Sequence, residues 1–256
     1  MKIIRYQEDD VSKINYGKLE NDKVYKILNS PFENEIEISN IPLNLSQTKI
    51  LSPVSPGKII CIATNFFGAT GVDNHMIEPM VFLKGKNTIT HNGNSVHLPF
   101  NLKCWGESEL GFVIKKKIKN QEKEKSDTTN LILGFLPCND VSCENISNRD
   151  HHLARSKSVD NFCPVGDYID TEYNPSNKYI KAYHNNELLR EGNTSEFIWN
   201  PPKIIFELSK WMTLSPGDLV LTGAPKRVRE RQFLENGDGY RVEIEGLPVL
   251  NNHFTK

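Results

Sequence analysis

The sequence lacks any excess of charge of one sign and any long apolar run. Its 256 residues carry 31 lysines and arginines against 32 aspartates and glutamates, a formal net charge of −1. Nucleic acid or an anionic membrane surface attracts proteins with a positive excess, so we predict neither as a partner. No stretch approaches the roughly 20 apolar residues of a membrane span, and the first 13 residues contain no apolar run of signal-peptide length. We therefore expect a cytoplasmic protein.

Cysteine is also scarce, and its spacing fits neither a metal site nor a disulfide framework. The five cysteines are scattered, without any CxxC pair: Cys61, Cys104, Cys138, Cys143 and Cys163. This pattern argues against structural zinc and against disulfides, so we expect reduced and mostly buried thiols. Hydrophobic residues make up 38% of the chain and charged residues 25%, proportions typical of a protein that closes a core.

Helical periodicity is the third scarce feature. The clearest case is PPKIIFELSKWMTL, residues 201–214, where two prolines precede apolar residues at helical spacing, ending with Trp211. Short strand-like runs dominate instead: KIIRY, VYKIL, KIICIAT, MVFLKG, SVHLPF, LGFVIKK, YIKAYHN, DLVLTG and YRVEIEG. We predict a β-rich α+β chain with a small N-terminal β lobe at residues 1–55 and a main domain at 56–256. The charged segment 115–130 is predicted to be a solvated loop or a short exposed helix between strands.

The segment WGESELGFVI contains the most informative acidic pair. On a strand, Glu107 and Glu109 point to the same face. Two adjacent carboxylates repel each other, and in a concave site a hard cation such as Mg²⁺, Mn²⁺ or Ca²⁺ removes the repulsion. A solvent-facing strand with merely polar glutamates is the alternative. Asp140, at the end of the apolar run GFLPCND, offers a third carboxylate, and Lys157 follows in ARSKSVDNFCPVG. Taken alone, the aspartate is also typical of a turn cap and the lysine of a surface charge.

Five motifs in order resemble the fumarylacetoacetate hydrolase superfamily: ESEL, NDVS, KSVDNFCPVG, GNTSEF and LSPGDLVLTGAP. The N-terminal MKIIRYQEDD resembles the small lobe of the bacterial members, and KIICIATNF resembles the strand that opens their catalytic domain. The resemblance implies a β-roll of mixed sheets, a homodimer and a 2-oxo or 1,3-dicarbonyl acid as substrate. It also implies a divalent cation, Mg²⁺ or else Mn²⁺ or Ca²⁺, held by Glu107, Glu109 and Asp140. Lys157 matches the family's active-site lysine, which can stabilise a negative oxygen.

The same resemblance suggests which residues contact the substrate, and it also shows departures. The expected substrate contacts are Asn65, Phe66, Asp160, Thr222 and Gly223. After NDVS, many members have an arginine where this chain has Glu144, and the TGTP-like turn loses its second hydroxyl at Ala224. We interpret Arg227, Arg229 and Arg231 as solvated surface residues, with a new anion contact by one of them as the alternative.

The pair that activates water in hydrolytic members is altered. Those members have a histidine and a glutamate four and seven residues after the asparagine that corresponds to Asn65. The two positions here are Ala69 and Val72, and neither can take a proton. His75, three residues before Glu78, repeats the spacing further along the chain, so it is either a displaced catalytic base or a polar loop residue.

These observations leave three functions open. The first is an enzyme that works through a metal-bound enolate without attack by water, by tautomerisation, decarboxylation, dehydration or cyclisation. The second is a hydrolase of C–C bonds in acylpyruvate-type substrates. The third is a non-catalytic binding or scaffold protein that keeps the cation for stability. We favour the first, because the metal ligands and Lys157 are retained while the pair that activates water is not.

Overall fold

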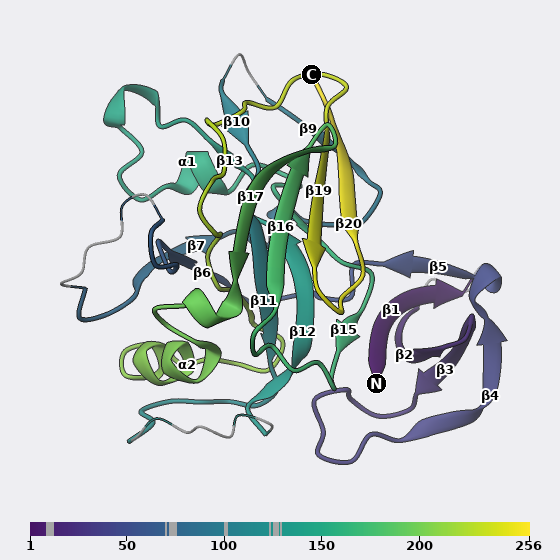
Figure 1. Cartoon of the computed structure of the whole chain (residues 1–256). Coiled ribbons are helices and arrows are strands. Elements are labelled where there is room, and N and C mark those ends of the chain that lie inside the picture. The colour runs from purple at the N-terminus through teal and green to yellow at the C-terminus, as the bar shows by residue number, and fades with distance from the viewer. Residues whose placement is uncertain are drawn as a thin grey trace.

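The computed structural model describes residues 1–8, 13–69, 71, 76–99, 102–122, 124, 128 and 130–256. Within them, strands far outweigh helices and form one large mixed sheet, a five-stranded sheet and a two-stranded pair (Figure 1). The β-rich α+β class predicted from the sequence is therefore confirmed.

The large sheet runs through the middle of the molecule. Its ten strands in path order are β4 (Ile38–Asn44), β3 (Lys23–Ile27), β2 (Ile14–Glu20), β1 (Lys2–Glu8), β15 (Ile169–Asp170), β12 (Ile132–Asn139), β11 (Ser108–Ile114), β18 (Leu219–Leu221), β6 (Ile59–Ala63) and β7 (Met80–Lys84). Off this path lie β5 (Thr48–Leu51), β8 (Ile89–His91) and β14 (Cys163–Val165). Most pairs are antiparallel, but β18 and β6 run parallel, as do β14 and β8.

The remaining strands and helices lie around this sheet. The five-stranded sheet contains, in order, β17 (Glu187–Asn193), β16 (Tyr179–His184), β19 (Gly239–Ile244), β20 (Leu250–Thr255) and β9 (Ser95–His97), and β10 (Cys104–Trp105) pairs with β13 (Ser142–Cys143). The α-helices are α1 (Ala154–Lys157) and α2 (Pro201–Ser209), and short 3₁₀ turns lie at Leu45–Gln47, Lys86–Thr88, Ile146–Asn148 and Thr194–Glu196. In Figure 1 the green-to-yellow sheet lies in front of β11 and β12.

Strand β11 lies at the centre of the core, and all seven of its residues are buried. Leu110, Phe112 and Ile114 pack toward the five-stranded sheet, as the alternation of a strand requires. Val113 points to the opposite face, into a second apolar cluster. A strand buried on both faces is a near-continuous apolar run, which explains why LGFVI has no polar positions.

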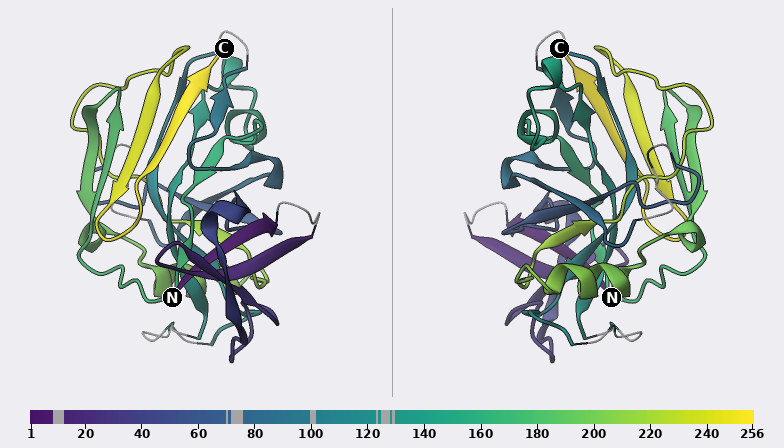
Figure 2. Two further views of the ribbon diagram at one scale, coloured as in Figure 1. Left: turned by 90° about the vertical axis from the view of Figure 1, so that its right-hand side faces the viewer. Right: turned by 90° about the vertical axis from the view of Figure 1, so that its left-hand side faces the viewer.

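The N-terminal strands are joined to the main body through β1. Ile3 pairs with Ile169 of β15, and the Arg5 guanidinium donates to the carbonyls of Ser52 and Val54 at 2.9 and 3.1 Å. The large sheet is therefore continuous across the expected boundary at residue 55. Figure 2 shows these purple strands on one side of the molecule, near its lower end.

Helix α2 forms where the sequence predicts a helix, but it ends five residues early. The Asn200 side chain caps its start by accepting from the Lys203 N–H at 3.0 Å. At the other end, the Ser209 carbonyl accepts from the Asn120 N–H at 2.8 Å, a contact with a distant loop. Trp211, expected on the buried helix face, is 60% exposed instead. The predicted end at residue 214 was wrong because this tertiary hydrogen bond turns the chain away.

The thiols and the loop at 115–130 bear on two further expectations. All five cysteines are free and buried, as the sequence predicts.

The described part of the charged loop is largely exposed, except that Ile118 is buried and forms a β-bridge with Leu214. No helix in the described part of the chain is long and apolar enough to cross a membrane.

We expect Gly134→Ala to lower the free energy of unfolding by about 1–3 kcal/mol, because a Cβ at Gly134 would lie 2.4 Å from the backbone oxygen of Asp170. This contact lies where β12 meets β15. Urea unfolding measures the change. Gly239→Ala is the matched control, since its Cβ would meet no heavy atom closer than 3.6 Å, at His253. An equal loss of unfolding free energy in both variants would contradict the argument that the contact of Gly134 with Asp170 limits the packing.

Candidate active site

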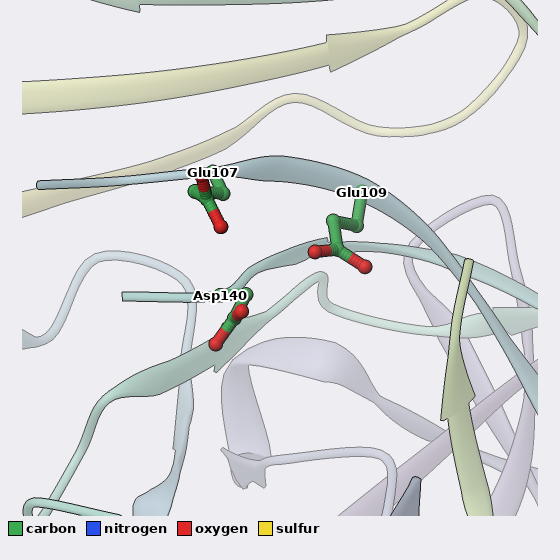
Figure 3. A group of neighbouring side chains, drawn as sticks. All are labelled: Glu107, Glu109 and Asp140. Carbon is green, nitrogen blue, oxygen red and sulfur yellow. The ribbon is translucent and has the colours of Figure 1, made fainter. Parts of the chain in front are cut away.

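Three acidic side chains meet at one end of the β11–β12 pair. Glu107 precedes β11, Glu109 lies in it, and Asp140 follows β12. The antiparallel register places Glu109 opposite Cys138, and the Asp140 N–H donates to the Glu107 carbonyl at 2.9 Å. One carboxylate oxygen from each acid lies within 4.8 Å of the others, and Figure 3 shows the three side chains converging.

The backbone segment that leads into the acidic cluster contains a glycine, Gly106, whose position is fixed by its contacts. A Cβ at Gly106 would lie 2.6 Å from the ring of Tyr240, so only glycine fits beneath that ring. The Tyr240 hydroxyl donates to the Gly106 carbonyl at 2.9 Å. The five-stranded sheet thereby holds the backbone immediately before Glu107.

Glu109 is the most electrostatically strained of the three acids. It is 2% exposed, and among the described residues its carboxylate accepts one hydrogen bond, from the Gly223 N–H at 2.6 Å. Burial raises the pKa of Glu109 well above its usual range, and the nearby charges of Asp140 and Glu107 raise it further. A cation among the three carboxylates would relieve this strain.

Asp140 is held by two lysines. The Lys84 ammonium donates to its Oδ1 at 2.5 Å, and the Lys157 ammonium donates to its Oδ2. Burial alone would raise the pKa of Asp140, but the charges of Lys157 and Lys84 hold it below its usual range. For Lys157, burial acts to lower the pKa, but Asp140 and Glu107 raise it above the usual value, so the amine stays protonated.

Lys84 and Arg190 were not identified from the sequence. Lys84 ends the apolar strand MVFLK, a strand-end charge like that of Asp140, and this position is the signal that could have found it. Arg190, in β17, donates to Glu107 at 2.8 Å and to the Pro225 carbonyl at 2.7 Å. No local pattern in the sequence ELLREGN marks Arg190, because its contact with Glu107 depends on where β17 lies in the fold.

A cavity of about 220 Å³ opens on the acidic cluster. Its described lining consists of Ile62, Ala63, Thr64, Ala69, Phe82, Glu107, Glu109, Asp140, Leu153, Lys157, Arg190, Gly223, Ala224, Lys226, Arg227 and Arg231. Thr64 has a φ of 51°, which is strained for a β-branched residue. Its hydroxyl is buried, without a hydrogen-bond partner among the described residues. Ala69 also lines the cavity and contributes only a methyl group, at the position that corresponds to the histidine of hydrolytic members.

The structure separates the expected substrate contacts into two groups. Gly223 lines the cavity, while Asn65 and Thr222 are fully buried behind it. The Asn65 amide donates to the carbonyls of Trp199 and Thr222, and the Thr222 hydroxyl donates to the Leu110 carbonyl at 2.8 Å. Both side chains hold the wall together because their polar groups are already used by the backbone.

The other expected contacts lie away from the described lining. Phe66 is fully buried, with its ring 4.8 Å from that of Phe197. Asp160 is exposed and accepts from the Asn87 amide at 2.6 Å. The placement of these two side chains therefore does not support the expected substrate contact. His75, the candidate base, and Val72 lie outside the described residues.

The donor set decides which cofactors fit. Among the described residues, the group consists of three carboxylates without a thiol or imidazole, and this set matches the oxygen ligands preferred by Mg²⁺, Mn²⁺ and Ca²⁺. Glu109, buried with one donor, is the side chain that most needs such a charge. The acidic group could therefore bind a divalent cation.

Comparison with known proteins identifies the family. Residues 58–255 match the family described as fumarylacetoacetate (FAA) hydrolase C-terminal, and residues 1–53 match Rv2993c-like, N-terminal. A fumarylacetoacetate hydrolase domain-containing protein 2 homolog from Dictyostelium discoideum is 33% identical over 253 residues, which cover 91% of this chain and 81% of that protein.

An enzyme and a solved structure with named activities are also similar. The mitochondrial oxaloacetate tautomerase of Xenopus laevis is 32% identical over 224 residues, 82% of this chain and 69% of that protein. The crystal structure of 5-carboxymethyl-2-hydroxymuconate delta-isomerase from Mycobacterium smegmatis has a TM-score of 0.88 at 26% identity, covering 100% of this chain and 99% of the other. The chain belongs to the fumarylacetoacetate hydrolase family.

Proposed function

We propose that the protein is a divalent-metal-dependent enzyme that converts a 2-oxo acid to its enol form and back, without hydrolysing a C–C bond. The observation that carries the proposal is the acidic group of half-buried Glu107 with buried Glu109 and Asp140, and Lys157 beside it in a small cavity. Ala69 supports the non-hydrolytic form, because it lines the cavity without a titratable group.

The acids and the lysines of the site would have different roles in this reaction. Glu107, Glu109 and Asp140 would hold Mg²⁺, Mn²⁺ or Ca²⁺, which when bound supplies a Lewis acid for a developing negative oxygen. The Lys157 ammonium, already protonated, adds a positive charge at the same end of the cavity. Lys84 keeps Asp140 ionised and oriented from behind.

The activities named for two similar proteins support an isomerising reaction. One is an oxaloacetate tautomerase and the other a delta-isomerase, and both names describe rearrangements that need no attack by water. Moving a proton between carbon and oxygen requires charge stabilisation on the oxygen, which Lys157 is placed to give. Hydrolysis would additionally need a group that activates water.

Glu109→Gln is expected to weaken Mg²⁺ binding by at least about 10–100-fold, the loss typical of even indirect changes at metal sites. Isothermal titration calorimetry measures the affinity. The variant should also lose the rise in melting temperature that Mg²⁺ gives the wild type, because only a bound ion stabilises the fold. Glu191→Gln, which removes a surface partner of Lys181, is the matched control. Unchanged Mg²⁺ affinity in Glu109→Gln would remove the metal assignment.

Lys157→Met is expected to lower kcat by about 10²–10³-fold while leaving Mg²⁺ affinity unchanged or higher. A lysine that stabilises charge in the transition state acts on turnover, whereas its positive charge opposes a neighbouring cation. Steady-state kinetics and calorimetry separate the two effects, and Lys181→Met, at an exposed ion pair, is the control. A variant with normal kcat would make Lys157 a purely structural residue.

The reaction itself is tested in D₂O with Mg²⁺ and oxaloacetate, by following deuterium uptake at the acidic carbon with NMR. We expect metal-dependent exchange above the enzyme-free rate, and we expect His75→Ala to retain it. In parallel, acetylpyruvate should be cleaved poorly, since a positioned general base contributes about 10²–10⁴-fold and Ala69 supplies none.

Two outcomes would replace the proposal. Rapid cleavage of acetylpyruvate to pyruvate and acetate, abolished by His75→Ala, would identify a hydrolase with a displaced base. If the protein catalyses no exchange and no cleavage but still binds Mg²⁺, the result would favour a metal-stabilised binding protein. The double variant Ala69→His with Val72→Glu then shows whether the cavity can support hydrolysis.

A further inference from the structure

Three cationic side chains from one short segment line the same cavity as the acidic cluster. They are Lys226, Arg227 and Arg231. They follow directly on the turn at 222–225, in which the Gly223 N–H binds Glu109. One short segment therefore connects the candidate metal ligands to a row of positive side chains.

Arg227 and Arg231 are held in position by different contacts. The backbone of Arg227 forms an isolated β-bridge with Arg190, and the next N–H, of Val228, donates to the Leu189 carbonyl at 2.9 Å. The guanidinium of Arg231 lies over the ring of Trp105, 4.2 Å from its centroid. These contacts restrict both residues before any ligand binds, which reduces the entropic cost of binding.

Among the described residues, neither Arg227 nor Arg231 has a carboxylate within ion-pair distance. Their neighbours in sequence and space do: Arg190 pairs with Glu107 at 2.8 Å, and Arg229 pairs with Glu187 at 2.6 Å. Arg231 is an exposed residue, and the limited burial of its guanidinium, together with the nearby charge of Arg227, lowers the pKa of this group. Two unpaired guanidinium groups close to each other are a binding site for an anion.

We propose that Arg227 and Arg231 form a carboxylate subsite that selects a short 2-oxo dicarboxylic acid over the corresponding monocarboxylic acid. The oxo-acid end of this substrate lies at Glu107, Glu109 and Asp140, and this part rests on the proposed function. The second carboxylate then reaches the two guanidinium groups, whose planar donor pairs match its two oxygens.

The size of the cavity limits the length of the substrate. Its volume of about 220 Å³ is below the roughly 300–1,000 Å³ typical of sites for drug-sized ligands. Both ends of the ligand must also lie in this one cavity, since the acids and the arginines share it. A compact dicarboxylate fits these two conditions.

The test uses a pair of stable, unreactive ligands that differ in one group. Malate and 2-hydroxybutyrate share the 2-hydroxy acid end, and only malate has the second carboxylate in place of a methyl group. Calorimetry with Mg²⁺ present should show wild-type protein binding malate about 10–100-fold more tightly, the range expected for hydrogen bonds between charged groups. Oxalate, which reaches only the metal end, reports whether that end is intact.

The variants assign the effect to particular side chains. Arg227→Gln and Arg231→Gln should remove most of the preference for malate while leaving the affinities for oxalate and 2-hydroxybutyrate unchanged. Arg227→Lys should retain part of the preference for malate, since a single ammonium replaces a guanidinium that can donate two parallel hydrogen bonds. Arg229→Gln is the matched control, because its side chain pairs with Glu187 and lines a different cavity.

Failure of the subsite and failure of the proposed reaction are distinguishable. Equal binding of malate and 2-hydroxybutyrate by the wild type, or an equal loss of oxalate and malate binding in the glutamine variants, would overturn the subsite even if oxaloacetate exchanges deuterium. A malate preference that depends on Arg227 and Arg231 would support the subsite even if no 2-oxo acid exchanges.

Discussion

The gathering of three carboxylates, two buried and one half-buried, at one end of two neighbouring strands is the constraint on which the rest of the site depends. Charges removed from water must be paired, and the chain pairs them unequally. Asp140 receives two lysines and Glu107 receives Arg190 with a longer contact to Lys157, whereas Glu109 receives a single backbone N–H. The unequal pairing leaves one buried acid whose charge a divalent cation would balance.

The two lysines on Asp140 have different surroundings and therefore different roles. The Lys84 ammonium is fully buried and also donates to the Val141 carbonyl, so it faces the protein interior. Lys157 lines the cavity and lies over the ring of Phe82, 4.6 Å from its centroid. Lys84 can thus fix the position and charge of Asp140, while Lys157 is the one that can reach a ligand.

Sequence reasoning located the acids but not their partners, for physical reasons. The alternation of a strand and the end of an apolar run are local patterns that mark Glu107, Glu109 and Asp140 as candidates, and the family resemblance implies that the three act together. Lys84 and Arg190 reach the acids only through strand pairing across the fold, which local patterns do not encode. The end of α2 at Ser209 is set in the same way, by a hydrogen bond from a residue 89 positions earlier in the chain, Asn120.

The turn at 222–225 separates the residues that hold the acids from the arginines of the proposed carboxylate subsite. Gly223 has a φ of 88°, and a Cβ there would lie 2.8 Å from the Ile62 carbonyl, so its backbone can approach Glu109 only as glycine. Thr222 is tied to Leu110, and Asn65 is tied to Thr222 and Trp199. With the turn anchored on this side, residues 226–231 can change without moving Glu109. The side chains of residues 226–231 that line the cavity can therefore differ while the acidic cluster keeps its geometry.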